Sequence, residues 1–347
     1  MRQTTRTLFT GYMGHVAQLN GIEDAGKSFN VTTPVQLTME EMIQESSAFL
    51  KLINILPVTD QVGQKVGLGV SGPAASRTDT ASKSRQTRDL TKMDPNGYQC
   101  VQTNFDTHIK YVMLDAWARF KDFQLRIRNA IITRQALDRI MIGFNGKNAA
   151  LDTDISANPM LEDVNKGWLQ HMRERAPERV LRTGKDGGKV LIGKGGDYRD
   201  LDAAVFDLSA LLDPWFHGDT QLVALVSRDT LHDKYFPLVN SGDKATEKLA
   251  SDIIISQKRL GGVQAVAVPY MPVGTVLLTR YDNLSIYPQE GARRRHIKEA
   301  PERDRVEFYE SSNDAYVIED FGCAALLENI ELLPEPADEA AGQSEGT

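Results

Sequence analysis

Hydrophobic residues recur at intervals of three and four in several segments of the chain, a pattern that predicts amphipathic helices. These segments are residues 5–20, 38–57, 114–144, 159–175 and 201–215. The second helix is expected to begin near Thr38, because Thr38 and Glu41 have the spacing of a capping box. The segment 114–144 has the strongest pattern and predicts one rod about 46 Å long at a rise of ~1.5 Å per residue.

Alternating hydrophobic and polar residues predict β-strands, most of them in the last third of the chain. We expect them at residues 62–70, 98–111, 222–226, 265–268, 276–278, 284–287, 306–309, 316–318 and 324–330. Strands and helices therefore both contribute to the predicted fold.

The segment 58–112 is unusual because its two predicted strands are separated by about twenty mostly polar residues. A loop of that length is uncommon inside a compact domain and usually serves a function or is disordered. We interpret the segment as a long hairpin that projects from its domain, with a solvated, flexible loop as the alternative. Its tip is cationic and carries Arg77, Lys83, Arg85, Arg88 and Lys92 against Asp79 and Asp89.

Charged residues also lie within the predicted elements. The charges of helix 114–144, Arg139 among them, are expected on a solvated face, with contact to neighbouring subunits as the alternative. Glu40 and Glu41 are expected at a helix start, where the helix dipole accounts for them. The run Arg293-Arg294-Arg295 predicts an internal ion-pair network with the acids that follow at 299–304, or a contact with phosphate or an acidic neighbour.

Composition narrows the function. The 347 residues include 40 Lys and Arg against 47 Asp and Glu, and the net charge of −7 argues against a protein that grips nucleic acid over its whole surface. Cys100 and Cys323 alone cannot form a disulfide scaffold or a cysteine zinc site. No apolar stretch approaches the ~20 residues of a membrane span, and residues 1–6 do not begin a secretory signal. We expect a chain made in the cytoplasm with no membrane contact.

A search for catalytic, cofactor-binding and metal-binding residues identifies none. The six histidines are scattered singly, without a second ligand at a metal-site spacing. The glycine-rich run that begins at Gly184 resembles a phosphate loop, but it lacks the required spacing and has Val190 where Ser or Thr would bind magnesium. A soluble enzyme that binds phosphate through Lys189 or Lys194 is therefore only a distant alternative.

Several blocks of sequence, in order over nearly the whole chain, resemble one family of proteins. They include MRQTTR at 1–6, DFQLRIRNAII at 122–132 and IISQKR at 254–259, with shorter blocks at 44–47, 158–161, 193–198, 233–237, 283–287 and 304–307. These blocks resemble the major capsid proteins of P2-like tailed bacteriophages. The resemblance is weakest at the hairpin tip, at 183–190 and in the acidic tail.

The resemblance implies an α+β protein with the HK97-like capsid fold. That fold has an N-terminal arm, an extended hairpin called the E-loop, a long spine helix, a peripheral domain and an axial domain. On this chain the parts would be a removable N-terminal segment at 1–31, the N-arm at 32–57, the E-loop at 58–112, the peripheral domain at 113–199 and 284–333 with its spine helix at 114–144, the axial domain at 200–283 and a disordered acidic tail at 334–347.

The same resemblance implies a structural role and a set of partners. Copies of the chain would assemble as pentamers and hexamers in the host cytoplasm, into the icosahedral shell of a virion that encloses double-stranded DNA without sequence specificity. An internal scaffolding protein or protease and a portal protein would be the other partners. A portal or a tail ring or tube component is the alternative.

Two groups of residues are candidates for this role. The hairpin cations Arg77, Lys83, Arg85 and Arg88 are predicted to contact an acidic surface of a neighbouring subunit, because a projecting hairpin enlarges each contact. Phe29, Asn30 and Val31 are predicted to contain the site where the N-terminal segment is cut on maturation. Before that cut, the helix at 5–20 would hold the scaffold, and the polar residues after Gly21 suggest that the segment can be removed without touching a core.

Overall fold

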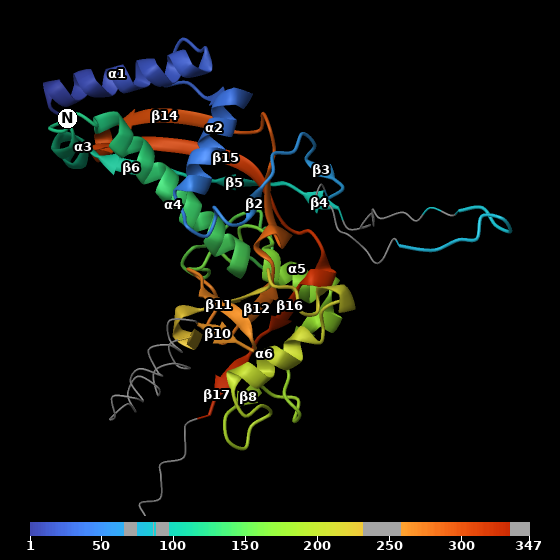
Figure 1. Ribbon diagram of the computed structural model, residues 1–347. Helices are drawn as coiled ribbons and strands as arrows, with labels where there is room; N and C mark the ends of the chain where they lie inside the picture. Colours follow the sequence, from blue (N-terminus) through green and yellow to red (C-terminus); the bar gives the residue numbers. More distant parts are fainter. Residues whose placement is uncertain (66–74, 86, 88–96, 232–257, 334–347) are drawn as a thin grey trace, which may run out of the picture. The chain divides into compact units, whose positions relative to one another are not determined.

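The structure is a computed structural model that describes residues 1–65, 75–85, 87, 97–231 and 258–333. It contains two compact units (Figure 1). Unit 1 consists of residues 1–171 and 281–320, and unit 2 consists of residues 172–280 and 321–347. The chain therefore passes from unit 1 to unit 2, returns, and ends in unit 2.

A seven-stranded sheet organises unit 1, and its centre is the fourteen-residue strand β15 (Arg305–Ile318). The sheet order is β1-β14-β15-β13-β2, with β5 and β6 also paired to β15. The other strands are β1 (Phe29–Asn30), β2 (Asn54–Ile55), β5 (Val101–Asn104), β6 (Thr107–Lys110), β13 (Leu284–Pro288) and β14 (Arg294–Ala300). The two short strands predicted at 306–309 and 316–318 are thus parts of one long strand, which spans residues that the alternation did not cover.

The helices of unit 1 confirm the segments predicted from periodicity but correct several of their limits. They are α1 (Gln3–Asn20), α2 (Thr33–Glu45), α3 (Tyr111–Trp117), α4 (Phe123–Asn145) and the start of α5 (Trp168–Arg175). The prediction that the second helix begins near Thr38 is wrong. Thr32 is the residue before α2, and Pro34 occupies its first turn, where the fixed backbone angle of proline favours a helix.

The single rod predicted at 114–144 is also wrong, because α3 and α4 are separate helices. The chain turns at residues 118–122, and Asp122, the residue before α4, accepts a hydrogen bond from Arg126 Nε at 2.9 Å and makes no side-chain cap. The guanidinium of Arg126 lies 4.0 Å from the ring centre of Phe120 in this turn. Similarly, α5 begins at Trp168 and not at 159, because residues 147–167 form turns.

Trp168 shows how closely α4, α5 and the sheet of unit 1 pack together. Its indole is fully buried, donates from Nε1 to the backbone oxygen of Ser285 at 3.1 Å and packs edge-on against Phe144 and Tyr316. A Cβ atom at Gly143 would lie 2.2 Å from this ring, so only glycine allows the approach of α4 to Trp168.

Unit 2 is built on a six-stranded sheet with the order β10-β11-β9-β12-β16-β7. The strands are β7 (Val180–Leu181), β9 (Val223–Val226), β10 (Arg259–Leu260), β11 (Val263–Ala267), β12 (Val276–Thr279) and β16 (Ala325–Leu327). Helix α6 (Leu201–Ser209) contributes Leu201, Val205 and Leu208 to an apolar core with β9, β12 and β16. A separate pair joins β8 (Val190–Ile192) to β17 (Ile330–Leu332).

These strands confirm the predictions at 222–226, 265–268 and 276–278 to within one or two residues. The strand predicted at 324–330 is wrong because Asn329 adopts a left-handed backbone conformation (φ 62°) and separates β16 from β17. Residues 180–181 and 190–192, which the resemblance assigned to the peripheral domain, pair with strands of unit 2. The predicted acidic tail at 334–347 lies outside the described residues.

Candidate interaction surfaces

The base of the predicted hairpin is an antiparallel pair between β3 (Val62–Gly63) and β4 (Tyr98–Gln99). Tyr98 fixes this base to the sheet: its ring packs edge-on against Tyr287 at 5.0 Å, and its hydroxyl donates to the backbone oxygen of Asp60. The adjacent Cys100 is fully buried, and burial, with Asp314 as a lesser cause, raises the pKa of its thiol to about 12. Cys100 is therefore an inert packing residue at the hairpin base.

The cations of the hairpin tip are exposed. Arg77, Lys83 and Arg85 lie on the surface and make no ion pair with the residues that the structure describes. A turn organises the segment, because Asp79 accepts hydrogen bonds from the backbone of Ala81 and from the hydroxyl of Ser82. Arg88, the fourth predicted contact residue, lies outside the described residues. Three of the four cations are thus available to an acidic partner.

The N-terminal segment is part of the core of unit 1, which contradicts the prediction that it can be removed without touching a core. Helix α1 and the residues after it bury an apolar face against Ile297 of β14, Val306 and Phe308 of β15 and the start of α4. The buried apolar residues of the segment are Phe9, Tyr12, Val16, Ala17, Ala25, Phe29 and Val31. The polar composition of residues 23–28 did not indicate this contact, because the buried apolar side chains come mostly from α1 before them and from Phe29 and Val31 after them.

The residues predicted to contain the cleavage site lie in this buried region. Phe29 and Asn30 form β1 and pair with Arg295 and Arg294 at the edge of the sheet. The backbone of Val31 donates to the oxygen of Arg293 at 2.9 Å, and Ile297 donates to the oxygen of Ala25 at 3.3 Å. Residues 25–31 therefore cover the outer edge of β14, and cutting them requires that this edge first opens.

Polar contacts hold the other end of the segment. Asp115 of α3 accepts from the Thr5 hydroxyl at 2.5 Å and from the Arg2 backbone at 2.9 Å. The Thr5 hydroxyl, and then the Arg2 amide, lower the pKa of Asp115. The whole segment is therefore bound to unit 1 along its length.

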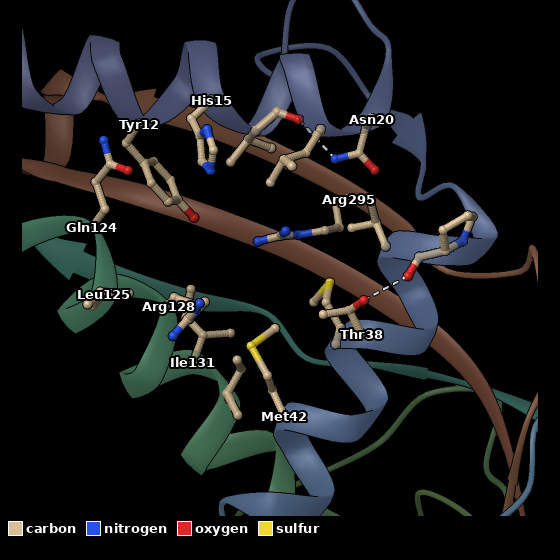
Figure 2. A pocket seen from close by; sticks show the side chains of 16 residues that line it. Tyr12, His15, Asn20, Thr38, Met42, Gln124, Leu125, Arg128, Ile131 and Arg295 are labelled. Carbon is tan, nitrogen blue, oxygen red and sulfur yellow. Dashed lines mark hydrogen bonds between the residues drawn. The ribbon is translucent and has the colours of Figure 1, made fainter.

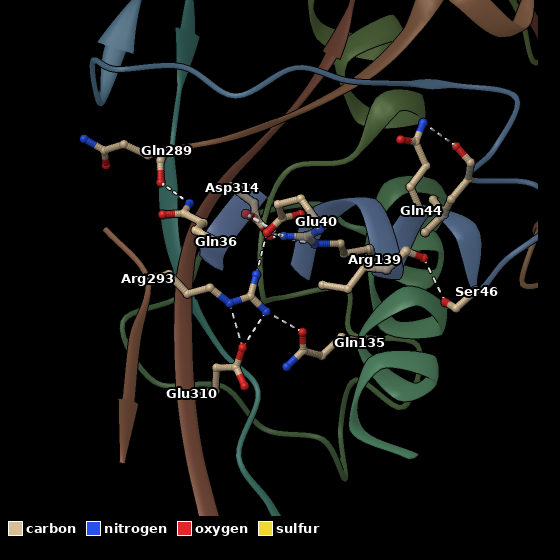
Figure 3. Close-up of polar contacts among 12 residues, drawn as sticks. Gln36, Glu40, Gln44, Ser46, Gln135, Arg139, Gln289, Arg293, Glu310 and Asp314 are labelled. Carbon is tan, nitrogen blue, oxygen red and sulfur yellow. Dashed lines mark hydrogen bonds and ion pairs between the residues drawn. The ribbon is translucent and has the colours of Figure 1, made fainter. Parts of the chain in front are cut away.

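A buried network of ion pairs lies beside the segment (Figure 3). Arg139 of α4 is completely buried and contacts both Glu40 of α2 and Asp314 of β15, the latter through Nε and Oδ2 at 3.1 Å. Arg293 is equally buried and contacts Glu40, the carboxylate of Glu310 at 2.6 Å and the side-chain oxygen of Gln135 at 2.6 Å. The network joins α2, α4 and β15.

The network extends from Glu310 to α1. Arg295 Nε lies 3.3 Å from Glu310 Oε2, and the Arg295 charge acts on Tyr12 of α1. Burial by itself would raise the pKa of Glu40, but Arg139 and Arg293 hold it below its usual value. Burial likewise opposes ionisation of Glu310, yet Arg293 and Arg295 lower its pKa. For Asp314, burial outweighs the Arg139 charge, and its pKa is raised.

The network corrects two interpretations made from the sequence. Arg139 is not on a solvated face, and Glu40 is not explained by a helix dipole, since it lies inside α2 and is buried. The internal network predicted for the run 293–295 is confirmed, although its partners are Glu40 and Glu310 and not the acids at 299–304. The spacing of residues could have indicated that Glu40 is buried. Gln36, Met39, Glu40 and Ile43 lie three or four residues apart on one face of α2, and all four are buried.

The glycine-rich connection forms an ordered surface turn. Both oxygens of Asp197 are occupied, one by the backbone of Lys185 and the other by that of Leu191, each at 2.8 Å. Lys189 pairs with Glu331 at 2.9 Å. Among the residues described here, no three His, Cys, Asp or Glu side chains come together as a metal site, and no helix has the length and apolarity needed to cross a membrane.

Comparisons with known proteins give one consistent result. The model of the P2 family of phage major capsid proteins matches residues 8–330. The capsid protein of Escherichia phage P2 is 50% identical over 342 residues, 96% of each chain, and the major capsid protein of Serratia phage KSP20 is 40% identical over 340 residues, 95% of this chain and 97% of that one. A chain of the satellite phage P4 procapsid, a structure that includes the size determination (Sid) protein, matches with a TM-score of 0.79 at 47% identity, covering 96% of this chain and 99% of that one. The α+β, HK97-like fold expected from the sequence is confirmed.

Proposed function

We propose that this chain, which belongs to the P2 family of phage major capsid proteins, assembles through its hairpin tip and is controlled by its N-terminal segment. Its role as the shell-forming subunit of a tailed phage follows from the family. The alternatives of a portal or tail component and of a phosphate-binding enzyme are set aside, because the family model matches nearly the entire chain. Pentamers and hexamers of the subunit would form the icosahedral shell.

The domains of the capsid fold are assigned to the two units. Unit 1 would be the peripheral domain, with α4 as its spine helix and β3–β4 as the base of the E-loop. Unit 2, with its own apolar core, would be the axial domain. Residues 32–57 would be the N-arm, and this assignment is supported by their position between the N-terminal segment and the hairpin.

The observation that carries the hairpin proposal is the contrast between its base and its tip. Tyr98 and Cys100 fix the base in the core, whereas Arg77, Lys83 and Arg85 are exposed and unpaired within the described residues. Cations that have no partner in their own subunit are suited to an acidic surface on the next one. We include Arg88 in the same contact on the basis of the sequence.

Deletion of residues 74–90 tests this contact. We expect the shortened subunit to remain folded, because β3, β4 and the contacts of Tyr98 are retained, and to form no closed shells. Negative-stain microscopy of the variant and of the intact chain, each produced with the scaffolding protein, measures the outcome, and thermal unfolding confirms that both fold. Closed shells of normal size from the shortened subunit would refute the role of the hairpin.

The N-terminal segment would bind the internal scaffolding protein or protease and would then be cut near Phe29–Val31. The exposed side of α1 supports a contact with a partner, and the short strand β1 marks the boundary between the segment and the body. Mass spectrometry of mature particles should find chains that begin near residue 32. Mature particles in which every chain retains Met1 would contradict trimming.

The remaining partners follow from the role of the subunit. A portal protein would occupy one site in the shell, and packaged double-stranded DNA would contact scattered Lys and Arg residues without sequence preference. We propose no catalytic residues, cofactor or metal for this role.

A further inference from the structure

Helices α1, α2 and α4 of unit 1 enclose a pocket of about 380 Å³ that the proposed role does not explain (Figure 2). Its floor is apolar and includes the buried residues Val16, Met39 and Ile131. At its rim, Leu19 and Leu125 leave about half of their surfaces exposed (53% and 48%). Large aliphatic side chains that surround a hollow in this way are typical of binding sites.

The charge of the pocket indicates what kind of partner it would accept. The chain has a net charge of −7, yet no Asp or Glu lines the pocket. Arg128 is exposed at the rim, and within the described residues its guanidinium contacts only the side-chain oxygen of Asn129. Arg295 also lines the pocket, and its Nε forms an ion pair with Glu310 at 3.3 Å. Arg128 is thus a cation available to an acidic partner beside an apolar hollow.

The shape of the site favours a helical partner. Three helices form its walls, and an amphipathic helix binds such a groove by inserting apolar side chains at spacings of three and four residues. Met39 and Met42 line the wall from α2, and the flexible methionine side chain adapts to inserted groups of different shape.

We propose that this pocket receives the apolar face of an acidic amphipathic helix from the scaffolding partner. The inference rests on the proposed binding of that partner by the N-terminal segment, and it extends the site to α2 and α4. Tyr12, His15 and Leu19 form the wall from α1, whereas Val35 and Met42 lie on the other side of residues 29–31 in the sequence. A cut at these residues would separate one wall from the other two and so release the partner.

A binding measurement with designed peptides tests the site. The probe is an 18-residue fluorescent peptide with Leu on one helical face and Glu on the other. One control peptide has Gln in place of Leu, and a second has Lys in place of Glu. We expect fluorescence anisotropy with the full chain to show binding of the Leu/Glu peptide at least about tenfold tighter than that of either control. Equal binding of the three peptides would overturn the proposal.

Substitutions locate the binding. Met42→Trp fills the pocket and should weaken binding at least about tenfold, whereas Val112→Trp, on the exposed face of α3, should not change it. Arg128→Glu should weaken binding about two- to fivefold, and the exposed Lys121→Glu, with the same change of charge, should have no effect. Binding that is indifferent to Met42→Trp would overturn the proposal.

Assembly distinguishes this proposal from the proposed function. The intact chain should form shells that contain the scaffolding protein, and Met42→Trp should lower the amount of that protein in the assemblies, as measured by mass spectrometry. Wild-type amounts in the Met42→Trp shells would refute the pocket while leaving the shell function intact. A change in the sedimentation of the isolated subunit on Met42→Trp would instead identify a second copy as the occupant and would also refute the proposal. If the intact chain formed no shells with its scaffold, the proposed function itself would fail.

Discussion

Residues 1–31 and the hairpin between β3 and β4 both belong to the N-terminal part of unit 1, but different forces hold them. The N-terminal segment contributes seven buried side chains to the core and pairs with the edge of β14. The hairpin is fixed at its base by Tyr98, and most of its described tip residues, 75–85, are exposed. An extension with an apolar stripe therefore packs against its own subunit, whereas one without such a stripe leaves its charges available to another.

The difference has a consequence for assembly. Removing the N-terminal segment exposes apolar side chains of β14 and β15 and an unpaired strand edge, so trimming changes the subunit itself. Removing the hairpin tip is expected to leave the core of unit 1 unchanged and to alter only the proposed contacts with other subunits. The first extension is suited to control the state of the subunit and the second to join subunits.

The largest expected effect is on stability when each extension is deleted. Deletion of residues 1–31 removes Phe9, Tyr12, Val16 and other buried side chains, each worth about 1.5–3 kcal/mol. We expect a loss of at least about 5 kcal/mol in the free energy of unfolding of the unassembled subunit, measured by denaturant titration. Deletion of residues 74–90 should change it by less than about 1 kcal/mol, and equal losses would contradict the distinction.

A pair of substitutions within α1 should give the next largest difference. Phe9 is 3% exposed and lies in the core, so Phe9→Ala should cost about 3–5 kcal/mol. Leu19, on the same helix, is 53% exposed, and Leu19→Ala should cost no more than about 0.5 kcal/mol. Thermal and denaturant unfolding of the two variants would show whether α1 is bound through one face, and similar costs would indicate that it is not.

Acid should loosen the N-terminal segment before it affects the hairpin base. Glu40 and Glu310 have lowered pKa values in the folded chain, so their contribution is complete above their ordinary pKa of 4.5 and is lost as the pH falls through the lower folded values. The raised pKa of Asp314 favours the folded state at low pH, but only this one carboxyl acts in that direction, whereas Glu40 and Glu310 both act in the other.

Because Arg295 pairs with Glu310 and lines the same pocket as Tyr12 of α1, we expect hydrogen exchange of α1 amides to accelerate below about pH 4.5, ahead of amides in β4. In Glu310→Gln, the same α1 amides should already exchange faster at pH 7, since Arg295 has lost its counter-ion. Simultaneous loss of protection in α1 and β4 would show that the network does not hold the segment specifically.

The smallest effect on stability should come from the hairpin cations. Replacing Arg77, Lys83 and Arg85 together by Ser should change the free energy of unfolding by less than about 0.5 kcal/mol, because the three side chains are exposed. Light scattering should nevertheless show slower shell formation and a weaker dependence on salt, since screened charge contacts between subunits are removed. Assembly with unchanged rate and salt dependence would exclude these residues from the contact.

Periodicity in the sequence was sufficient to predict α1, the buried strands β9, β12 and β13 and the start of α6, which ends at Ser209 and not near 215. Their apolar residues repeat with the period of the element. Sequence blocks spread over the chain also sufficed to predict the family and the fold. The exposed charges of the hairpin tip were likewise predictable, since a segment with almost no apolar residues has nothing to bury.

Only the tertiary structure decided where Glu40, Arg139 and Arg293 lie. They come from parts of the chain up to 253 residues apart, and each becomes stable in the interior only when its partners are present there. The packing of residues 1–31 could not be predicted for the same reason. The sequence shows the apolar stripe of α1, but the residues that cover this stripe belong to β14 and β15, near the other end of the chain. A local pattern determines which face of an element is apolar, and long-range packing determines what that face is buried against.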